Sequence, residues 1–420
     1  MASTETLLQA PFLAGLVLRA GASADDIDGV TPRIVVEPRT AEELAAILAA
    51  AAREQLTVVL RGGGTKLGAG RIPKAIDLLV VTRALRRVLA HEHADLTATI
   101  EAGATLDEVS QALGRHRQWL PLDPAGEAAT IGGAIATNDS GPLRHRYGTP
   151  RDLLIGITLA TTDGRLVKAG GTVVKNVAGY DLGKLVSGSC GSLAAIVSAT
   201  FKLLPMPAAC CTLSAAFDTA EAAARAAAMV NDSQLEPMSL EVHTSHAGAT
   251  APRYGLLARF ATAPAAALAQ ARQARTLVAA GDITEGPAEA ALWRGYQARA
   301  SSSAGGAVLG MSWLPATLPG VLALVGEIAQ AGGAVTLAAR AGIGAGRLSL
   351  DGSPKWQASA VTRLRGRSDL LRHVTIHDAP LAVKQAVDVW GPPGAAAGLG
   401  AAVKHAFDPE GILNAGRGPL

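Results

Sequence analysis

Aromatic side chains are scarce in this sequence: Phe, Trp and Tyr together make up 3% of its 420 residues. A chain so poor in aromatic residues lacks the stacking platform on which single-stranded nucleic acids are usually bound. Its 38 Lys and Arg residues nearly balance its 35 Asp and Glu residues, which leaves a net charge of +3. The charge therefore gives no indication of a nucleic-acid or membrane partner.

Cysteine is also rare, and its spacing excludes several kinds of site. Cys190, Cys210 and Cys211 provide neither a disulfide framework nor the repeated spacing of a metal or iron–sulfur site. We therefore expect a reduced, cytoplasmic chain without a bound metal.

Long apolar runs are missing as well. Gln9 and Pro11 interrupt the apolar patch near the N-terminus, and no stretch reaches the ~20 apolar residues that a membrane helix needs. We expect any association with a membrane to be made through partner subunits.

The residues that are present predict a mixed α+β chain of two or three domains. Residues 34–60 indicate a strand, a helix and a strand, and Thr40 with Glu43 indicates a capping box at the start of that helix. Thr105 and Glu108 form the same pattern before a second helix. Beyond Pro205–Ala209 the amino-acid composition changes. Alanine-rich stretches at 218–231, 262–280 and 317–331 predict the helices of a second α+β domain.

One stretch, "LRGGGTKLGAG" at residues 60–70, places five glycines behind a strand-like run. It fits neither the phosphate loop G-x-x-x-x-G-K-[ST] nor the dinucleotide fingerprint G-x-G-x-x-G. The backbone N–H groups from Gly62 to Lys66 are nevertheless able to converge on an anion, because glycine permits the positive φ values that such a nest requires. The alternative is a plain turn between strands.

Two later stretches are also rich in small residues. "ATIGGAIATNDSG" reads as a second small-residue loop, on which backbone would lie flat against a ligand. "GGTVVKNVAGYDLGKLVSGSCGSL" follows the predicted hairpin around Asp163-Gly164, and its Asp181 is placed to cap a helix over residues 182–186.

The motifs "RGGGTKLG", "PLDPAGEAATIGGAIATN", "RYGTPRDLLIGITLATTDGRL", "VKNVAGYDLGKLVSGSCGSL" and the terminal "FDPEGILNAGR", taken in this order, resemble the FAD-binding oxidoreductases of the vanillyl-alcohol oxidase (PCMH-type) fold. Within that group they are most similar to the FAD-binding subunit of glycolate oxidase. The resemblance implies an α+β fold in which a two-subdomain PCMH-type FAD-binding domain precedes an α+β cap domain of the FAD-linked oxidase type.

The resemblance also implies domain bounds. We expect an N-terminal segment at residues 1–28, the FAD-binding domain at 29–208, and the cap or substrate domain at 209–420 with a tail that returns to the FAD-binding domain. We expect the active site in a cleft between the two domains, and Asn414 or Arg417 of the tail close to that cleft.

The cofactor implied is FAD. In many relatives a His in or near the first glycine loop tethers the flavin, and this loop has none, so we expect non-covalent binding. The residues expected to bind FAD are Arg61, Gly62, Gly63, Gly64, Thr65, Lys66, Pro124, Thr130, Ile131, Gly132, Gly133, Thr137, Asn138, Ser140, Arg146, Tyr147, Gly148, Gly188, Ile196 and Val197.

Catalytic residues are harder to assign. Relatives that oxidise glycolate or D-lactate carry histidines in a C-terminal "HxGDGNxH"-like segment, whereas the corresponding "ARAGIGAGRLSLDG" has none. We expect Arg340 in that segment to hold a substrate carboxylate, and Lys175 and Tyr180 to lie near the flavin ring. Other histidines remain open alternatives, above all the pair His373 and His377.

Three functions are compatible with these motifs. The first is the FAD-binding subunit of a glycolate oxidase-like complex, which oxidises a small 2-hydroxy acid and passes electrons to a second flavin subunit and an iron–sulfur subunit. The second is a self-sufficient FAD-dependent hydroxy-acid or alcohol dehydrogenase. The third is a non-catalytic flavin relay subunit.

Overall fold

The computed structural model describes residues 4–173, 179–246, 253–299 and 305–419. Within these ranges the chain divides into two compact units, which are described separately. The first unit takes residues up to 140, residues 149–206 and residues from 392 onward. The second takes residues 141–148 and 207–391. The domain bounds expected above remain a prediction.

The first unit begins with a four-stranded sheet in the order β1-β2-β4-β3. Its strands are β1 (Val17–Ala20), β2 (Ile34–Glu37), β3 (Val58–Arg61) and β4 (Leu78–Val81). β2, β4 and β3 run parallel, and α2 (Ala41–Arg53) connects β2 to β3. A parallel pair needs such a crossover, so the predicted strand, helix and strand over residues 34–60 are confirmed.

The capping box predicted for α2 forms only in part. Thr40 Oγ1 accepts a hydrogen bond from the Glu43 backbone N–H at 3.1 Å, as expected. Glu43 Oε2, however, accepts from the Arg39 backbone N–H at 2.6 Å instead of from Thr40. The box predicted for α3 (Leu106–Gly114) is complete, because Thr105 N donates to Glu108 Oε2 at 2.7 Å and Glu108 N donates to Thr105 Oγ1 at 3.2 Å.

A second, antiparallel sheet of the first unit has the order β5-β6-β10-β8-β9. Its strands are β5 (Val88–Glu92), β6 (Thr97–Glu101), β10 (Ala195–Lys202), β8 (Leu154–Ala160) and β9 (Leu166–Gly170). β8 and β9 form the hairpin predicted around Asp163-Gly164. One core of this unit joins the sheet to α3 and to the short helices α4 (Ile131–Thr137) and α7 (Leu182–Val186), the latter capped by Asp181 as predicted.

The stretch at residues 130–138 is a helix, so the prediction of a small-residue loop there was wrong. Thr130 Oγ1 caps α4 by accepting from Gly133 N at 3.3 Å, and Asn138 ends it in the left-handed conformation with φ 48°. Glycine is a poor helix former, which concealed the helix in the sequence. Gly132 lies against Ala102, the residue after β6, and a Cβ on it would come within 2.8 Å of Ala102 Cβ, so this close packing requires the small residue there.

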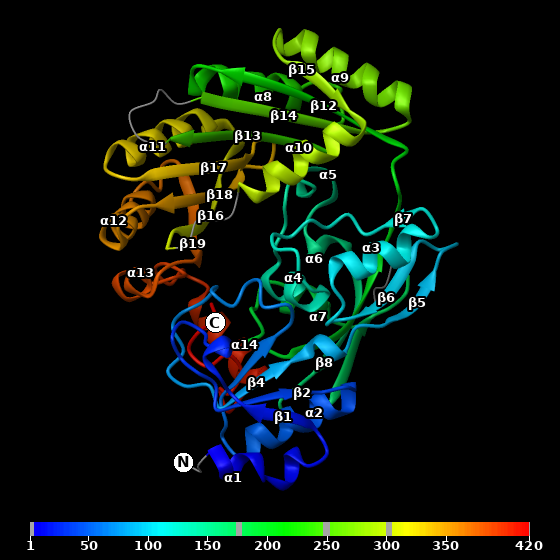
Figure 1. Cartoon of the computed structure of the whole chain (residues 1–420), viewed down its shortest axis with the longest axis vertical. Helices are drawn as coiled ribbons and strands as arrows, with labels where there is room; N and C mark the ends of the chain where they lie inside the picture. The colour runs from blue at the N-terminus through cyan, green and yellow to red at the C-terminus, as the bar shows by residue number, and fades with distance from the viewer. Residues whose placement is uncertain (1–3, 174–178, 247–252, 300–304, 420) are drawn as a thin grey trace. The chain divides into compact units, whose positions relative to one another are not determined.

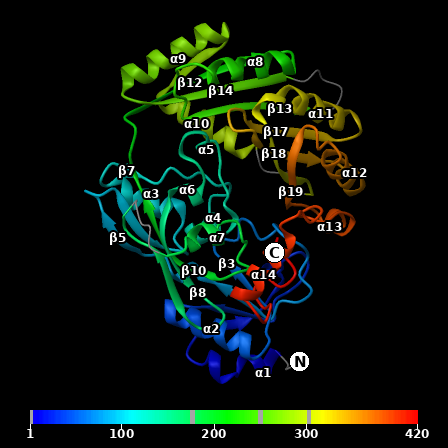
Figure 2. The same cartoon turned by 180° about the vertical axis from the view of Figure 1, so that it is seen from behind.

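The C-terminal segment returns to the first unit. Figure 2 shows α14 (Ala397–Phe407) beside β3 and β8, and Figure 1 shows the same neighbourhood from the other side. Lys404 Nζ donates to Ser192 O at 2.7 Å, and Val58 N donates to Ile412 O at 2.9 Å. The end of the chain thereby becomes part of the fold formed by its beginning.

The second unit is built on an eight-stranded antiparallel sheet in the order β15-β12-β14-β13-β17-β18-β16-β19. Its strands are β12 (Ala209–Phe217), β13 (Ser239–His246), β14 (Arg253–Thr262), β15 (Asp282–Glu285), β16 (Ala307–Trp313), β17 (Ala334–Arg340), β18 (Ala345–Asp351) and β19 (Leu371–Asp378). Its helices are α5 (Arg144–Tyr147), α8 (Ala220–Asn231), α9 (Pro264–Val278), α10 (Gly286–Ala298), α11 (Leu318–Gln330), α12 (Pro354–Arg365) and α13 (Leu381–Ala386). The three predicted alanine-rich helices correspond to α8, α9 and α11.

The two faces of this sheet are covered differently. Apolar side chains of α8, α9, α11, α12 and α13 pack on one face and form the large core of the unit. On the other face α10 contributes Trp293 and Tyr296, which pack against Leu257 and Ala338. The second face also carries polar side chains, among them Glu241, which is 1% exposed. None of the helices in the described ranges is both long and apolar enough to cross a membrane.

Candidate functional site

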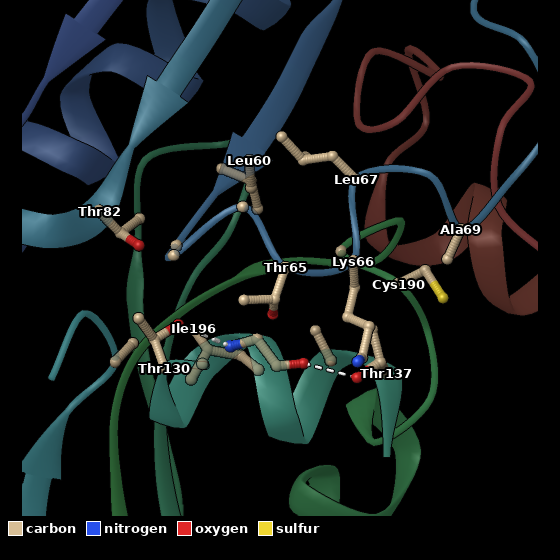
Figure 3. Close-up of a pocket in the computed structure, with 18 of the residues that line it drawn as sticks. Leu60, Thr65, Lys66, Leu67, Ala69, Thr82, Thr130, Thr137, Cys190 and Ile196 are labelled. Atoms are coloured by element: carbon tan, nitrogen blue, oxygen red, sulfur yellow. Dashed lines mark hydrogen bonds between the residues drawn. The ribbon is translucent and has the colours of Figure 1, made fainter. Parts of the chain in front are cut away.

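A cavity of the first unit lies between the glycine loop, defined here as residues 62–71, and helix α4 (Figure 3). Its lining consists of Leu60, Gly62, Gly63, Gly64, Thr65, Lys66, Leu67, Ala69, Thr82, Ala102, Thr130, Gly132, Gly133, Ala136, Thr137, Cys190, Gly191, Ala194, Ile196, Asn414 and Arg417. Most of these residues are small, so the walls offer backbone groups and hydroxyls. The lining includes two cations, Lys66 and Arg417, and no carboxylate among the described residues.

The glycine loop follows β3 and lies tightly against the start of α4. A Cβ on Gly62 would come within 2.2 Å of Thr130 Oγ1, and one on Gly63 within 1.7 Å of the Ala128 carbonyl oxygen. Gly64 adopts a φ of +79°, and a Cβ there would meet nothing closer than Leu67 Cδ1 at 3.8 Å. Only glycine permits both the close approach and the left-handed turn without strain.

Hydroxyl groups line the α4 side of the cavity. Thr130, at the start of α4, uses its Oγ1 as the cap of the helix. Thr137, at the other end of α4, donates its hydroxyl to Gly133 O at 2.8 Å, the hydrogen bond drawn in Figure 3. Both side chains are held by backbone contacts, so this wall is preorganised.

Lys66 carries its charge from the glycine loop toward the C-terminal end of α4 (Figure 3). Its Nζ donates to Ala125 O at 2.7 Å and lies 3.1 Å from Asp139 Oδ2. Asp139 is buried and also accepts from Ala125 N at 3.0 Å. These contacts fix the ammonium group at the edge of the cavity.

Cys190 places its sulfur in the cavity wall (Figure 3). Burial raises the pKa of this thiol to about 11, and the nearby Arg417 opposes the shift. The thiol is therefore neutral at physiological pH and a slow nucleophile. All three cysteines are free.

Ten of the residues expected to bind FAD lie together in this lining: Gly62, Gly63, Gly64, Thr65, Lys66, Thr130, Gly132, Gly133, Thr137 and Ile196. The others do not line it. Ile131 and Val197 are buried in apolar cores, and Pro124, Asn138, Ser140 and Gly188 lie elsewhere in the first unit. Arg146, Tyr147 and Gly148 belong to the second unit.

Arg61 precedes the loop but forms a different contact. Its NH1 donates to Asp25 Oδ1 at 3.1 Å, and Arg19 donates to both oxygens of the same carboxylate, at 2.5 and 2.8 Å. The hydrogen bonds from Arg19 are the main cause that holds the pKa of Asp25 far below its usual range. Asp25 lies 36 residues before Arg61, and no local sequence signal indicates this pairing.

The lining also contains residues that the sequence did not identify as a site, including Leu60, Thr82, Ala102, Cys190 and Ala194. Small apolar residues carry no chemical signature, so their place could not be predicted from the sequence. Asn414 and Arg417 are different, since the motif in the C-terminal tail suggested them, and both are in the lining.

The candidate catalytic residues do not share a unit. Lys175 lies outside the described residues. Tyr180 is 91% exposed and lines a second cavity of the first unit, beside Arg151, Asp181 and Lys202. Arg340 belongs to the second unit, where it is 8% exposed and its Nε donates to Gly141 O at 2.8 Å.

The histidines of the second unit have separate surroundings. His145 packs against Asn231 and the turn at Gly342, where a Cβ would come within 2.5 Å of its ring, and burial lowers its pKa. His373 and His377 both lie on β19, and the ring of His377 packs on Gly310. Across the described ranges, no three His, Cys, Asp or Glu side chains are grouped so that they could hold a metal ion.

Comparison with protein families matches residues 32–170 to the FAD binding domain. These residues include β2 to β4, the glycine loop, α4 and the whole of β8 and β9. The cofactor expected from the sequence, FAD, is thereby confirmed, while its non-covalent attachment stays a prediction.

Curated relatives match about half of the chain. A D-lactate dehydrogenase of Archaeoglobus fulgidus is 36% identical over 208 residues, which are 50% of this chain and 46% of that protein. The glycolate oxidase subunit GlcD of Bacillus subtilis is 32% identical over 211 residues, 50% of this chain and 45% of the subunit. The chain thus spans less than half the length of these relatives.

Solved structures match over nearly the whole chain. One structure of an alkyldihydroxyacetonephosphate synthase has a TM-score of 0.70 at 16% identity, covering 98% of this chain and 85% of that one. A second, from another crystal form, has a TM-score of 0.67 and covers 92% and 76%. At this identity the likeness shows the fold alone. Together with the match of residues 32–170 to the FAD binding domain, it confirms the expected α+β fold, an FAD-binding domain followed by an α+β cap domain.

Proposed function

Residues 32–170 belong to the FAD binding domain family, and from this premise we propose that the chain is the FAD-holding subunit of a glycolate oxidase-like complex. The complex would oxidise a small 2-hydroxy acid to a 2-oxo acid. The observation that carries the proposal is the cavity between the glycine loop and α4, whose composition fits a flavin dinucleotide.

The fit rests on charge and on size. A diphosphate is an anion that needs several donors, and the glycine loop presents successive backbone N–H groups with the Lys66 ammonium group beside them. An isoalloxazine ring needs a flat, small-residue wall, which Gly132, Gly133 and Ala136 of α4 provide. Thr130 and Thr137 supply hydroxyls at the two ends of that wall.

Bound FAD supplies a hydride acceptor for the oxidation of a secondary or primary alcohol. The chain's own residues would have to hold the substrate and take its hydroxyl proton. We assign the carboxylate of the substrate to Arg340, because guanidinium groups bind carboxylates through paired hydrogen bonds. Lys175 and Tyr180 remain proposed neighbours of the flavin ring.

The sheet of the second unit supports this role of Arg340. Arg340 pairs with Glu241 across β17 and β13, and Ala338 pairs with Arg347 across β17 and β18. Residues two apart on a strand share a face, so both guanidinium groups stand on the face that α10 partly covers. Glu241 accepts a hydrogen bond from Tyr296 OH at 2.6 Å, which fixes this carboxylate beside Arg340.

Electrons removed from the substrate need a route out of the chain. The three cysteines cannot provide the four thiolates of an iron–sulfur cluster. A second flavin subunit and an iron–sulfur subunit therefore complete the proposed complex, and any contact with a membrane is assigned to them. The Bacillus subtilis relative is a subunit of glycolate oxidase, which supports the proposal that this chain works with partner subunits.

A self-sufficient dehydrogenase is the second candidate, favoured by the likeness to a D-lactate dehydrogenase. The two candidates differ in what the isolated chain does. As a complex subunit, the purified chain takes up FAD but is not reduced at a useful rate by glycolate or D-lactate under anaerobic conditions. Rapid bleaching of the flavin absorbance by either acid in the isolated chain would favour the dehydrogenase.

The position of FAD has a separate test that does not require activity. Cys190 lines the cavity, whereas Cys210 and Cys211 lie on β12 in the second unit. We expect FAD to protect Cys190 from a small alkylating reagent at pH 9, and to leave the alkylation of Cys210 unchanged, when the modified peptides are identified by mass spectrometry. Equal labelling of Cys190 with and without saturating FAD would contradict the proposed site.

A further inference from the structure

The C-terminal segment, residues 408–417, contacts two parts of the cavity lining, the glycine loop and the turn that contains Cys190. Asn414 Nδ2 donates to Cys190 O at 2.5 Å, and its backbone N donates to Val58 O at 2.7 Å. Arg417 NH2 donates to Leu67 O at 2.6 Å, within the glycine loop. The segment therefore joins the glycine loop to the cysteine turn, defined here as residues 188–192, across more than 120 residues of sequence.

Arg417 is held to the glycine loop in two directions. Its Nε donates to Arg71 O at 3.1 Å, and its own carbonyl oxygen accepts from Arg71 N at 3.1 Å. Its side chain is 2% exposed, so burial lowers its pKa, an effect that Asp28 opposes from 3.5 Å. A buried guanidinium is costly unless its hydrogen bonds are satisfied, and here the carbonyl oxygens of the loop satisfy them.

Hydrogen bonds within the C-terminal segment and to α14 define its conformation. Asp408 is 1% exposed and accepts from the backbone N–H groups of Ile412 at 3.2 Å and Leu413 at 2.8 Å. Lys404 pairs with Asp408 and donates to Leu413 O at 2.9 Å. Asn414 follows in the left-handed conformation, with φ 51°. These local contacts direct Asn414 and Arg417 toward the cavity.

We propose that Asn414 and Arg417 are positioning residues that hold the glycine loop and the cysteine turn at the separation FAD binding requires. The C-terminal segment then sets the affinity for the cofactor, although it lies more than 200 residues beyond the rest of the cavity. The inference rests on the proposed FAD site. It predicts that changes in this segment act on cofactor affinity out of proportion to their effect on stability.

Arg365 offers a matched control. Its guanidinium also donates to three backbone carbonyls, those of Val374 at 3.1 Å, Asp388 at 2.7 Å and Val389 at 3.1 Å. It belongs to the second unit and does not line the cavity. Arg365→Gln therefore removes a comparable set of contacts, and the expected cost falls on stability alone.

The experiment measures FAD affinity by quenching of flavin fluorescence, and the melting temperature of each apoprotein, in the full chain. Arg417→Gln is expected to weaken FAD binding about 100-fold, which corresponds to about 2.8 kcal/mol. Arg417→Lys keeps the charge but not the planar fork, and Asn414→Asp keeps the left-handed backbone but loses the donor to Cys190 O. Each of these is expected to weaken binding about tenfold. Arg365→Gln is expected to lower the melting temperature and to change FAD affinity by less than about twofold.

The spectrum of the remaining bound flavin gives a second readout. If the walls move apart, the flavin absorbance of Asn414→Asp should shift toward that of free FAD, and Cys190 in its apoprotein should be alkylated faster than in the wild type. Should Arg417→Gln fail to fold, Arg417→Lys and Asn414→Asp decide the question. Wild-type affinity in both, or an equal loss in Arg365→Gln, overturns the inference. A wild-type chain that binds no FAD overturns the proposed function instead.

Discussion

Replacing Gly63 by alanine tests the central geometric feature of the cavity, the close approach of the glycine loop to the residues before α4. The added Cβ would stand 1.7 Å from the Ala128 carbonyl oxygen. Carbon and carbonyl oxygen atoms come no closer than about 3.3 Å in weakly attractive contacts. The obstacle is backbone rather than a flexible side chain, so the loop itself has to move by about 1.6 Å.

A movement of this size is large on the scale of hydrogen bonds, whose useful N···O range is about 2.7–3.2 Å. Donors of the loop that contact a phosphate would leave that range. A hydrogen bond to a charged group contributes about 1.5–3 kcal/mol, so losing two of them costs about 3–6 kcal/mol. Gly63→Ala is therefore expected to weaken FAD binding by about 100-fold to 10,000-fold.

Gly64→Ala is the matched control in the same loop. Its Cβ would meet nothing closer than 3.8 Å, but its φ of +79° is unfavourable for alanine. The expected cost is about 1–2 kcal/mol of stability with FAD affinity close to that of the wild type. The assay is titration of each apoprotein with FAD, with far-UV circular dichroism as the check on folding. A folded Gly63→Ala chain that binds FAD like the wild type, or more tightly than Gly64→Ala, would refute the reasoning.

Three further predictions concern the second unit. Burial, with a smaller effect of Arg299, lowers the pKa of His243 to about 4 in the folded chain. Between pH 6.5 and 4 the unfolded chain therefore binds more protons than the folded chain does. The free energy of unfolding should fall by up to about 3 kcal/mol as the pH drops through that window. Urea unfolding of His243→Gln should show a flatter pH dependence, and an unchanged one would contradict the assignment. The Glu289 carboxylate accepts hydrogen bonds from Arg259 at 2.7 and 3.0 Å and from Thr212 at 2.8 Å. Glu289→Ala should therefore lower the free energy of unfolding, measured in urea, by about 3–5 kcal/mol. A loss below about 1 kcal/mol would show that these hydrogen bonds contribute little to stability. In the intact complex, Arg340→Lys should raise the KM for the 2-hydroxy acid by about tenfold or more while FAD affinity stays constant; a change in FAD affinity without a change in KM would argue against a carboxylate site at Arg340.

Patterns that involve residues close in sequence predicted the local structure well. Thr105 and Glu108 are three apart and form the complete capping box that their spacing indicates. Asp181 caps α7, and Asp163-Gly164 turns the chain between β8 and β9. Such signals act within one turn of backbone, so they do not depend on the rest of the fold.

The errors arose where distant partners outweighed local preference. Gly132 lowers the helix propensity of α4, yet packing against Ala102 stabilises the helix. Arg61 ends β3, and its guanidinium donates to Asp25, which lies 36 residues earlier in the chain. In each case the residue type could be read from the sequence, but a partner far away in the sequence decided which contact that residue makes.

The amino-acid order alone therefore specified the glycine loop, its ability to adopt left-handed turns, and the succession of motifs that indicates FAD. Folding decided which of those residues line one cavity, and it added residues such as Thr82, Ala102 and Cys190 that no motif had indicated. The reason is physical: backbone conformation is governed by neighbours a few residues apart, whereas a binding wall is assembled from segments hundreds of residues apart. Leu67 and Arg417, separated by 350 residues and joined by one hydrogen bond of 2.6 Å, are the clearest case.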